Sequence, residues 1–318
     1  MARRRKGHKV DGWLVLDKPA GLSSAAAVAA VRRVFNAAKI GHGGTLDPLA
    51  TGVLPIALGE ATKTVAYAMD GAKIYRFVVR WGEQRATDDS EGEVVATSAH
   101  RPGEAEIRAA LSRFVGDIEQ VPPVYSALKI DGRPAYARAR AGETLTMAAR
   151  TVRIDRLDLD AVIDADHASF TVACGKGTYI RSLARDLAEA LGTCGHIATL
   201  RRLRVGPFRE EDAIPLEKLA SLGHSPARFT YLRPVETALD DIPALAVTEA
   251  DSLRLRRGQV VQIRRAAHEH SIDHELGPER IVLATASGLP VALAKMEPDA
   301  AGVEPGIALL RPVRVLNL

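Results

Sequence analysis

Apolar and polar residues repeat along the chain with two different periods, which together predict a mixture of strands and helices. Residues 74–81 and 168–174 alternate apolar and polar side chains, as half-buried strands do. Apolar residues at helical spacing predict a helix over 180–191, closed by Gly192 and capped by Thr178. Because strands and helices follow one another without a regular βαβ rhythm, the pattern favours an α+β fold with a mixed sheet over a doubly wound one.

Shorter signals predict the other elements of the first half of the chain. A short strand ends at Asp17, and Ser23 or Ser24 is placed to cap a helix that runs to Phe35. The pair Asp131-Gly132 is a strong turn signal. The other expected elements are a short helix at 61–69, an amphipathic helix at 105–114 and a strand at 125–130.

The character of the sequence changes near residue 243. From 208 to 243 the chain is polar and broken by prolines, whereas 244–318 is rich in Val and Leu with short segments and turns. The strands expected there are 281–284, 290–296 and 307–316, which suit a small β-domain. We therefore expect a basic tail at 1–10, a main domain at 11–243 and a C-terminal domain at 244–318.

Composition limits the class of protein. Of 318 residues, 47% are hydrophobic and 26% are charged, as in an ordinary globular protein. No apolar run reaches the roughly 18 residues of a membrane span, and no apolar segment of signal-peptide length follows the basic start. With two cysteines in the chain, a disulfide framework is not indicated, and we expect a cytoplasmic protein.

The net charge of +4 is modest, but the basic residues gather in three clusters. Such clusters neutralise the phosphates of nucleic acids, although any single cluster is more often a solvated face. Together they indicate an anionic partner without naming it. The clusters are Arg3, Arg4, Arg5, Lys6 and Lys9; Arg201, Arg202 and Arg204; and Arg254, Arg256 and Arg257, with Arg264 and Arg265 close behind.

The most informative stretch is 41–54, Gly-His-Gly-Gly-Thr-Leu-Asp-Pro-Leu-Ala-Thr-Gly-Val-Leu. It places Asp47 in a glycine-rich segment between a predicted helix and an apolar run. Asp-Pro commonly starts a turn, because Asp bonds its own backbone and Pro presets φ. Taken alone, Asp47 therefore has two equally good interpretations, a turn residue and an active-site carboxylate.

The whole string favours the interpretation of Asp47 as an active-site carboxylate. It resembles the catalytic loop of the TruB family of tRNA pseudouridine synthases, Gly-x-Leu-Asp-Pro-x-Ala-x-Gly-x-Leu. Further strings occur in the order of that family and together cover most of residues 11–208. These strings are Asp17-Lys18-Pro19-Ala20-Gly21-Leu22-Ser23-Ser24, Lys73-Ile74-Tyr75-Arg76, residues 122–129, Lys176-Gly177-Thr178-Tyr179-Ile180-Arg181 and Leu200-Arg201-Arg202. Less specifically, the part from 244 onwards, with 255–259, resembles a PUA-type RNA-binding domain.

The resemblance implies a catalytic domain on a mixed, largely antiparallel sheet flanked by helices, followed by a small β-barrel-like PUA-type domain. It implies isomerisation of the T-loop uridine at tRNA position 55, by cleavage of the N1–C1′ bond and rejoining through C5. That reaction needs no redox change or outside energy, so neither a cofactor nor a metal is expected. The expected partner is the T-arm of tRNA, with no membrane, no obligate protein partner and a monomeric enzyme.

The same resemblance assigns the site residues. Asp47 is the nucleophile acting on a base flipped out of the stack, and Arg181 is the counter-charge that a carboxylate in an apolar pocket needs. The ring of Tyr75 stacks on the uracil, and its hydroxyl is available for proton transfer. The remaining substrate contacts are His42 between its glycines, Tyr179, and Leu200 as an apolar wall.

Plainer interpretations stand beside these assignments. A tyrosine beside Phe77 on a strand usually belongs to the core, and a lone arginine such as Arg181 in an amphipathic helix usually lies on its surface. The attack of Asp47 on the base or on the sugar is left open. Two alternatives remain for the whole protein: a guide-RNA-dependent pseudouridine synthase, and a non-catalytic tRNA-binding or folding module.

Two further features are interpreted as structural. His268-Glu269-His270, with His274-Glu275, lies in a charged stretch far from the other motifs and is expected to be a solvated loop, not a metal cluster. Cys174 lies on the apolar face of a predicted strand. We therefore expect it to pack in the core and not to act as a nucleophile.

Overall fold

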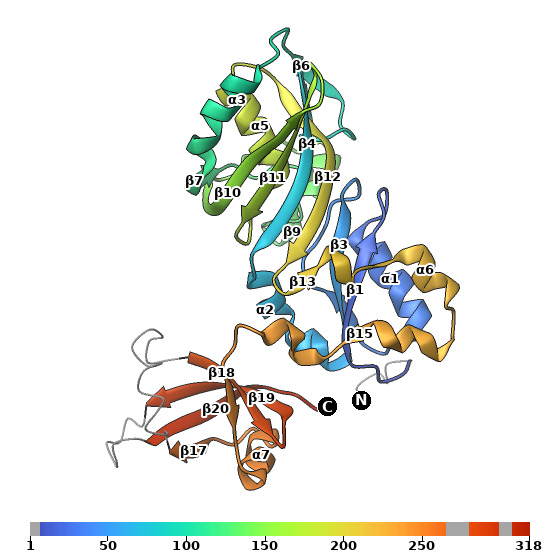
Figure 1. The fold of residues 1–318 in the computed structure, drawn as a ribbon, viewed down its shortest axis with the longest axis vertical. Helices are drawn as coiled ribbons and strands as arrows, with labels where there is room; N and C mark the ends of the chain where they lie inside the picture. Colours follow the sequence, from blue (N-terminus) through green and yellow to red (C-terminus); the bar gives the residue numbers. More distant parts are fainter. Residues whose placement is uncertain (1–6, 265–279, 299–306) are drawn as a thin grey trace.

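The computed structural model describes residues 7–264, 280–298 and 307–318. Within these ranges the chain forms an 11-stranded sheet, a five-stranded sheet and two small hairpins. Figure 1 shows the two larger sheets along one long axis, with the five-stranded sheet at one end. Three sequence predictions concern residues outside these ranges. They are the basic residues at 3–6, Arg265 of the third basic cluster, and the charged histidine-containing stretch at 268–275.

The large sheet is mixed and mostly antiparallel, as predicted. Along its main path the strands are β14 (Ile214–Pro215), β1 (Gly12–Lys18), β3 (Thr51–Leu58), β12 (Gly195–Val205), β4 (Lys73–Trp81), β11 (His167–Cys174), β10 (Arg150–Val162) and β7 (Gly116–Gln120). Beside this path, β2 (Ile40–His42) pairs with β3, β13 (Phe208–Arg209) with β12, and β15 (Leu232–Arg233) with β1. The parallel pairs are β1–β14 and β3–β12.

The two halves of this sheet meet where β3 lies beside β12. Thr51 pairs with Arg201 and Gly52 pairs with Arg202 in parallel register. Gly52 has a φ of 97°, and a side chain at this position would collide with the backbone carbonyl of Arg202. Glycine is therefore required for the two halves to approach this closely. The loop that carries Asp47 leads directly into β3 at this seam.

Helices cover the sheet as their apolar faces dictate. α1 (Ser24–Phe35) begins at Ser23, whose side chain accepts a hydrogen bond from the Ala26 amide, and it buries Val31 and Phe35. α3 (Glu104–Leu111) continues into a 3₁₀ turn (Ser112–Phe114). α3 and α5 (Ile180–Ala190) both lie beside the half of the sheet that contains β10 and β11 (Figure 1).

Three sequence predictions are wrong in detail. α5 starts at Ile180 with Tyr179 as its N-cap, and the Thr178 hydroxyl donates instead to the Gly175 carbonyl at 3.2 Å. The expected helix at 61–69 divides at Thr64, because a 3₁₀ turn precedes a short α-helix. These two elements are η1 (Gly59–Lys63) and α2 (Val65–Asp70).

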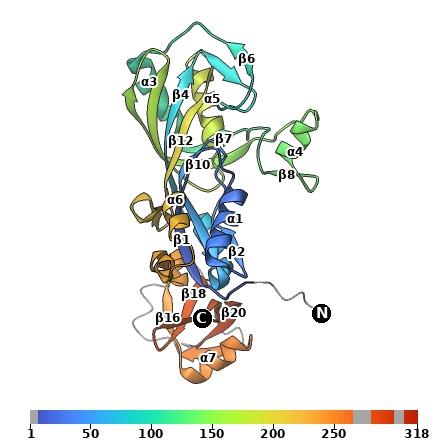
Figure 2. The ribbon, with the colours of Figure 1, turned by 90° about the vertical axis from the view of Figure 1, so that its right-hand side faces the viewer.

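The third error concerns the expected strand at 125–130, which is reduced to β8 (Lys129–Ile130). β8 forms a hairpin with β9 (Arg133–Pro134), and Asp131-Gly132 makes the turn with positive φ at both residues, as predicted. α4 (Ala135–Arg140) follows the hairpin. Figure 2 shows this hairpin and α4 projecting from the body of the molecule.

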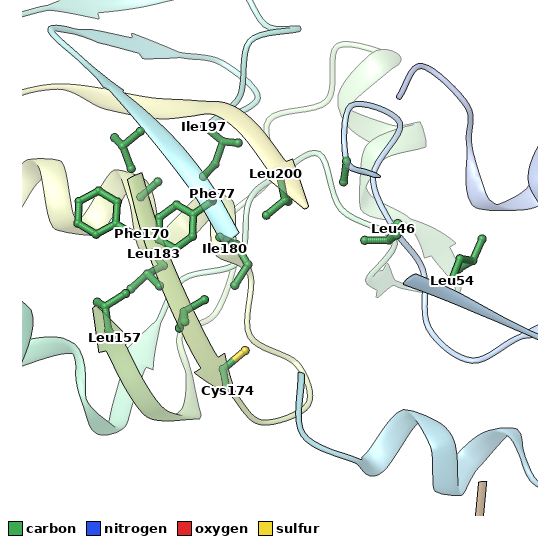
Figure 3. Close-up of a cluster of buried hydrophobic side chains, with 14 of the residues drawn as sticks. Leu46, Leu54, Phe77, Leu157, Phe170, Cys174, Ile180, Leu183, Ile197 and Leu200 are labelled. Atoms are coloured by element: carbon green, nitrogen blue, oxygen red, sulfur yellow. The ribbon is translucent and has the colours of Figure 1, made fainter. Parts of the chain in front are cut away.

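One apolar core joins the two halves of the large sheet. Phe77 on β4 stacks on Phe170 of β11, with ring centroids 5.3 Å apart. Leu46, on the loop before β3, and Leu54, on β3, belong to the same cluster (Figure 3). Cys174 is also buried in this core, as predicted, and burial raises the pKa of its thiol to about 11.

The five-stranded sheet confirms the strands expected after residue 280. Its order is β16 (Ala244–Ala246), β18 (Arg280–Ala286), β19 (Leu289–Pro298), β20 (Ile307–Val315) and β17 (Val261–Arg264), and α7 (Glu249–Arg256) packs on it. Leu316 is fully buried in a cluster with Trp13 of β1. Lys63 also donates to the Val315 carbonyl at 2.7 Å, so the two sheets are in direct contact.

Candidate active site

Asp47 and Arg181 form a two-point ion pair at the seam of the large sheet. The Nε of Arg181 donates to Oδ2 of Asp47 at 2.9 Å, and its Nη2 donates to Oδ1 at 3.2 Å. The Arg181 side chain is 4% exposed, whereas the Asp47 side chain is 32% exposed. A buried cation therefore holds the carboxylate from one side, while its other side stays accessible. The interpretation of Arg181 as a surface residue is wrong.

The guanidinium of Arg181 is itself held by the surrounding chain. Nη1 donates to the Thr87 carbonyl at 2.8 Å, and Nη2 donates to the Tyr125 carbonyl at 2.9 Å. The buried Asp89 lies 3.6 Å from Nη1 and adds a second negative charge. With these acceptors the plane of the guanidinium is fixed, and so is the direction from which Asp47 is contacted.

The backbone on both sides of Asp47 is also fixed. The buried Ser24 hydroxyl donates to the Leu46 carbonyl and accepts from the Leu46 amide, both at 2.8 Å. On the other side, the Gly21 amide donates to the Pro48 carbonyl at 2.8 Å. These bonds join the loop to the start of α1 and leave the Asp47 side chain between two anchored residues.

The Lys18 side chain also holds this loop. Its ammonium donates to the carbonyls of Pro19, Leu22 and Pro48 at 2.7–3.1 Å, and the residue is fully buried. Burial lowers the pKa of Lys18 to about 8, and the nearby charge of Asp47 opposes part of that fall. Lys18 is therefore a buried cation near Asp47 that is mostly protonated at neutral pH.

Arg202 braces the glycine-rich part of the loop. It is 2% exposed, and its guanidinium donates to the carbonyls of Gly44, Thr45 and Val53 at 2.8–3.2 Å. The neighbouring Arg201 is paired with Asp17 at 3.0 Å. The prediction that these arginines form one phosphate-neutralising cluster or a solvated face is therefore wrong for Arg202, which is a structural cation of the loop.

A cavity of about 460 Å³ opens beside the ion pair, a volume typical of small-molecule sites. Four of the predicted site residues line this cavity together: Asp47, Tyr75, Tyr179 and Leu200. Further basic side chains in its wall are Lys73, Arg150 and Lys176. The cavity thus combines an accessible carboxylate, aromatic and apolar walls and a cationic surround, which suits an uncharged planar group on an anionic backbone.

The two aromatic residues of the cavity are held differently. Tyr75 lies on β4 opposite Arg202, and burial raises the pKa of its phenol, so that the hydroxyl stays protonated at neutral pH. Tyr179 is fixed through its backbone, because Gln120 accepts from its amide at 2.8 Å and donates to its carbonyl at 3.1 Å. The Arg150 guanidinium lies 4.9 Å from the centre of the Tyr179 ring.

His42 lies apart from the other predicted residues. It is on β2 and lines a separate recess of about 440 Å³ together with Arg32 and Lys39. Its Nδ1 is buried without a hydrogen-bond partner. Burial, with a smaller effect of the Arg202 charge, lowers the pKa of His42, so the ring is neutral at pH 7.

Several residues of the site escaped the sequence analysis. Lys18 stands within a string that resembles the family, but the sequence alone predicts no role for it. Gln120 and Asp89 lie outside every string, and their parts depend on contacts with α5, which starts 60 residues or more further along the chain. Across the described ranges no three His, Cys, Asp or Glu side chains are grouped to hold a metal ion.

Comparison with solved structures and family models places this geometry in a known class. The chain superimposes on a chain of a Cbf5-Nop10-Gar1 complex with a TM-score of 0.71 and 26% identity, covering 97% of this chain and 86% of that one. Residues 32–180 match the N-terminal domain of TruB family pseudouridylate synthases, and residues 181–240 match the C-terminal domain of tRNA pseudouridylate synthase B. The fold is that of a pseudouridylate synthase.

Individual relatives narrow the class. The chain is 51% identical to tRNA pseudouridine synthase B of Caulobacter vibrioides over the full length of both chains. It is 58% identical to the protein of the same name from Bradyrhizobium diazoefficiens over 82% of this chain and 77% of that one. The chain therefore belongs to the TruB family, as the sequence motifs indicated. In the part of the chain that the structure describes, no helix is both long and apolar enough to span a membrane.

Proposed function

We propose that this TruB-family enzyme isomerises the uridine at T-loop position 55 of tRNA, with Asp47 as the nucleophile. The observation that carries the proposal is the two-point Asp47–Arg181 pair, whose free side faces a cavity lined by Tyr75, Tyr179 and Leu200. Relatives at about half identity carry the name tRNA pseudouridine synthase B, which supports tRNA as the substrate.

The residues divide the chemistry between them. Arg181 holds and directs the Asp47 carboxylate, so that it attacks the flipped nucleoside as the N1–C1′ bond breaks. The detached uracil turns in the cavity, and C5 bonds to C1′ while the bond from the nucleoside to Asp47 breaks and frees the carboxylate. The C5 proton then leaves and N1 gains a proton. Tyr75 supports the base with its ring, and its protonated phenol is a candidate carrier for the C5 proton. Leu200 and Tyr179 limit the positions that the base can take.

The rest of the molecule would hold the RNA. We assign 11–243 to the catalytic domain and 244–318 to a PUA-type domain that binds the tRNA outside the flipped nucleotide. Basic side chains around the cavity would contact phosphates, so affinity should fall steeply with salt. The enzyme is expected to work as a cytoplasmic monomer. His42, with its unpaired ring nitrogen, would stack on a base displaced from the T-loop.

A guide-RNA-dependent synthase is the second candidate, because the superimposed chain comes from a complex with Nop10 and Gar1. Full-length identity to tRNA pseudouridine synthase B relatives favours the stand-alone enzyme. The two candidates differ in what they need: the stand-alone enzyme modifies a bare tRNA transcript, whereas the guided enzyme needs an added RNA and partner proteins.

The deciding experiment incubates the purified enzyme with an unmodified tRNA transcript and maps pseudouridine by chemical tagging and mass spectrometry. We expect one new pseudouridine, at position 55, without a guide. An Asp47→Asn enzyme should bind the tRNA but lose about 10⁴-fold or more in turnover. Asp160→Asn, on an exposed part of β10, is the matched control and should keep the wild-type rate. Normal turnover in Asp47→Asn would refute the nucleophile.

A further inference from the structure

A second arginine extends the charged network of the active site along α5. Arg185 lies one helical turn beyond Arg181, and its Nη1 donates to Oδ2 of Asp88 at 2.9 Å. The side chains of Arg185 and Asp88 are 15% and 9% exposed, so this pair is largely buried. Arg185 also binds Asp186 through Nε at 3.0 Å. Arg185 is therefore a largely buried arginine with several bonds, one helical turn from the Asp47–Arg181 pair.

Arg181 and Arg185 hold the same turn. Thr87, Asp88 and Asp89 are consecutive. Arg181 contacts the backbone carbonyl of Thr87 and the side-chain carboxylate of Asp89. Arg185 contacts the residue between them. The turn is therefore held at three successive positions by two guanidiniums that project from one face of one helix.

The same two arginines also hold the segment that leads to the projecting hairpin. Arg181 donates to the Tyr125 carbonyl, and Arg185 donates to the Val121 carbonyl, both at 2.9 Å. The Ser182 hydroxyl donates to the same Val121 carbonyl at 2.8 Å. Every acceptor that orients Arg181, apart from Asp47, thus lies on a segment that Arg185 also holds.

The turn depends on such support. Asp88 has a φ of 59°, in the left-handed region that few residues other than glycine adopt. Its amide donates to the Arg85 carbonyl at 2.9 Å, and its carbonyl accepts from the Ile197 amide at 3.1 Å. A strained conformation of this kind persists where the surroundings determine it from several sides. The bond to Arg185 is the one that holds the side chain.

We propose that Arg185 and Asp88 are positioning residues for the reaction: their ion pair keeps the 87–89 turn in the place where it orients Arg181, and through Arg181 it orients Asp47. This proposal rests on the proposed function, in which Asp47 attacks the flipped uridine. Neither residue lines the cavity beside Asp47. Loss of the pair lets the turn relax, so that the guanidinium of Arg181 loses its fixed plane while the cavity remains.

The charge balance at Asp88 supports this role. Burial raises the pKa of Asp88 to about 6, against the lowering effects of Arg185 and Arg181, while the neighbouring Asp186 raises it further. Without Arg185, the buried carboxylate would have to take up a proton or move towards water. Either change removes the contact that holds the side chain of the strained residue.

The test compares Arg185→Met in two backgrounds, wild type and Arg181→Lys, by single-turnover rate and by tRNA affinity. In the wild type we expect a rate loss between about tenfold and a hundredfold, with the Kd for tRNA changed less than about twofold. In the Arg181→Lys background the same change should cost less than about twofold, because the group on which Arg185 acts is already altered. Arg185→Lys, which restores a cation for Asp88, should recover most of the rate.

Equal losses in both backgrounds, or a loss confined to tRNA affinity, would overturn the proposal. If Arg185→Met does not fold, Asp88→Asn in the same two backgrounds gives the same comparison with a smaller change of shape. Arg108→Met removes an exposed helical arginine paired with Glu104 at 2.8 Å, and it should leave the rate unchanged. An Asp47→Asn enzyme with full turnover would instead refute the proposed function, whatever Arg185 does.

Discussion

The cavity at Asp47 and the recess at His42 are similar in volume, but the buried groups beside each are bonded differently. Beside the cavity, the buried cations Lys18, Arg181 and Arg202 are each bonded to two or three backbone carbonyls. In the recess, Nδ1 of His42 is buried without a partner. The groups around Asp47 are therefore fixed by the protein itself, whereas His42 has a buried polar atom that the described residues leave unpaired.

Among the variants that test this comparison, the largest effect is expected from removing Arg181, the cation paired with Asp47. Arg181→Met should lower turnover by about 10³-fold, because Asp47 loses two charge-assisted bonds and the buried Asp89 loses a nearby positive charge. The affinity for tRNA should change far less, since Arg181 is buried behind the cavity wall. Single-turnover rates beside filter-binding affinities measure both. A loss of affinity as large as the loss of rate would place Arg181 in RNA binding.

A smaller effect is expected from Tyr75→Phe, which keeps the packing of the ring on β4 and removes the hydroxyl. Loss of a positioned proton carrier typically costs about 10²-fold in rate. The melting temperature shows whether the fold is unchanged, and it should stay within a few degrees of the wild-type value. If the variant keeps both its stability and its full rate, the hydroxyl has no catalytic part and the residue serves as a stacking surface.

The recess should respond in affinity and not in chemistry. His42→Ala removes a ring that we expect to stack on a displaced base, a contact worth about 1–3 kcal/mol, so the Kd for tRNA should rise about tenfold. The rate at saturating tRNA should fall much less. His42→Phe, which keeps an aromatic face, should recover most of the affinity. If the rate of His42→Ala at saturating tRNA fell as far as that of Arg181→Met, the cavity and the recess would not be separate in function.

The smallest effect is a pH dependence at Lys18, whose pKa is lowered to about 8. As the pH rises from 7 to 8.5, the protonated fraction and the turnover that depends on it should fall about fourfold. Stability should move the other way: the native state disfavours the charged form, so the free energy of unfolding rises between about pH 8 and the ordinary lysine value of 10.5. Rate and melting curves against pH measure both trends, which Lys18→Met should abolish.

The sequence was most informative where function constrains a local string. The motifs assigned Asp47, Tyr75, Tyr179 and Leu200 to the site, and the structure places all four in the wall of one cavity. The motifs also assigned Arg181 as the partner of Asp47, and the two side chains are bonded in the structure. Periodicity located most strands and helices, because alternation and helical spacing are set by the face that each element buries. The strand expected at 125–130 failed because the Tyr125 carbonyl is bonded to Arg181 and not to a neighbouring strand.

The supports of the site were not predictable in the same way. Arg202 stands in a row of basic residues that resembles an exposed surface, yet its partners lie about 150 positions earlier in the chain. Arg185 and Asp88 are 97 positions apart and belong to no string. Such roles follow from register and closure of the sheet, which local patterns do not contain.

The bond between Asp47 and Arg181 joins positions separated by 134 residues, one on the loop before β3 and the other on α5. During synthesis on the ribosome, the carboxylate emerges long before its cation, so a nascent chain without α5 has no catalytic pair. Contacts of such long range form late and slowly. The acquisition of activity would therefore report the end of folding, and a fragment that stops short of α5 would be inert even if its own strands were ordered.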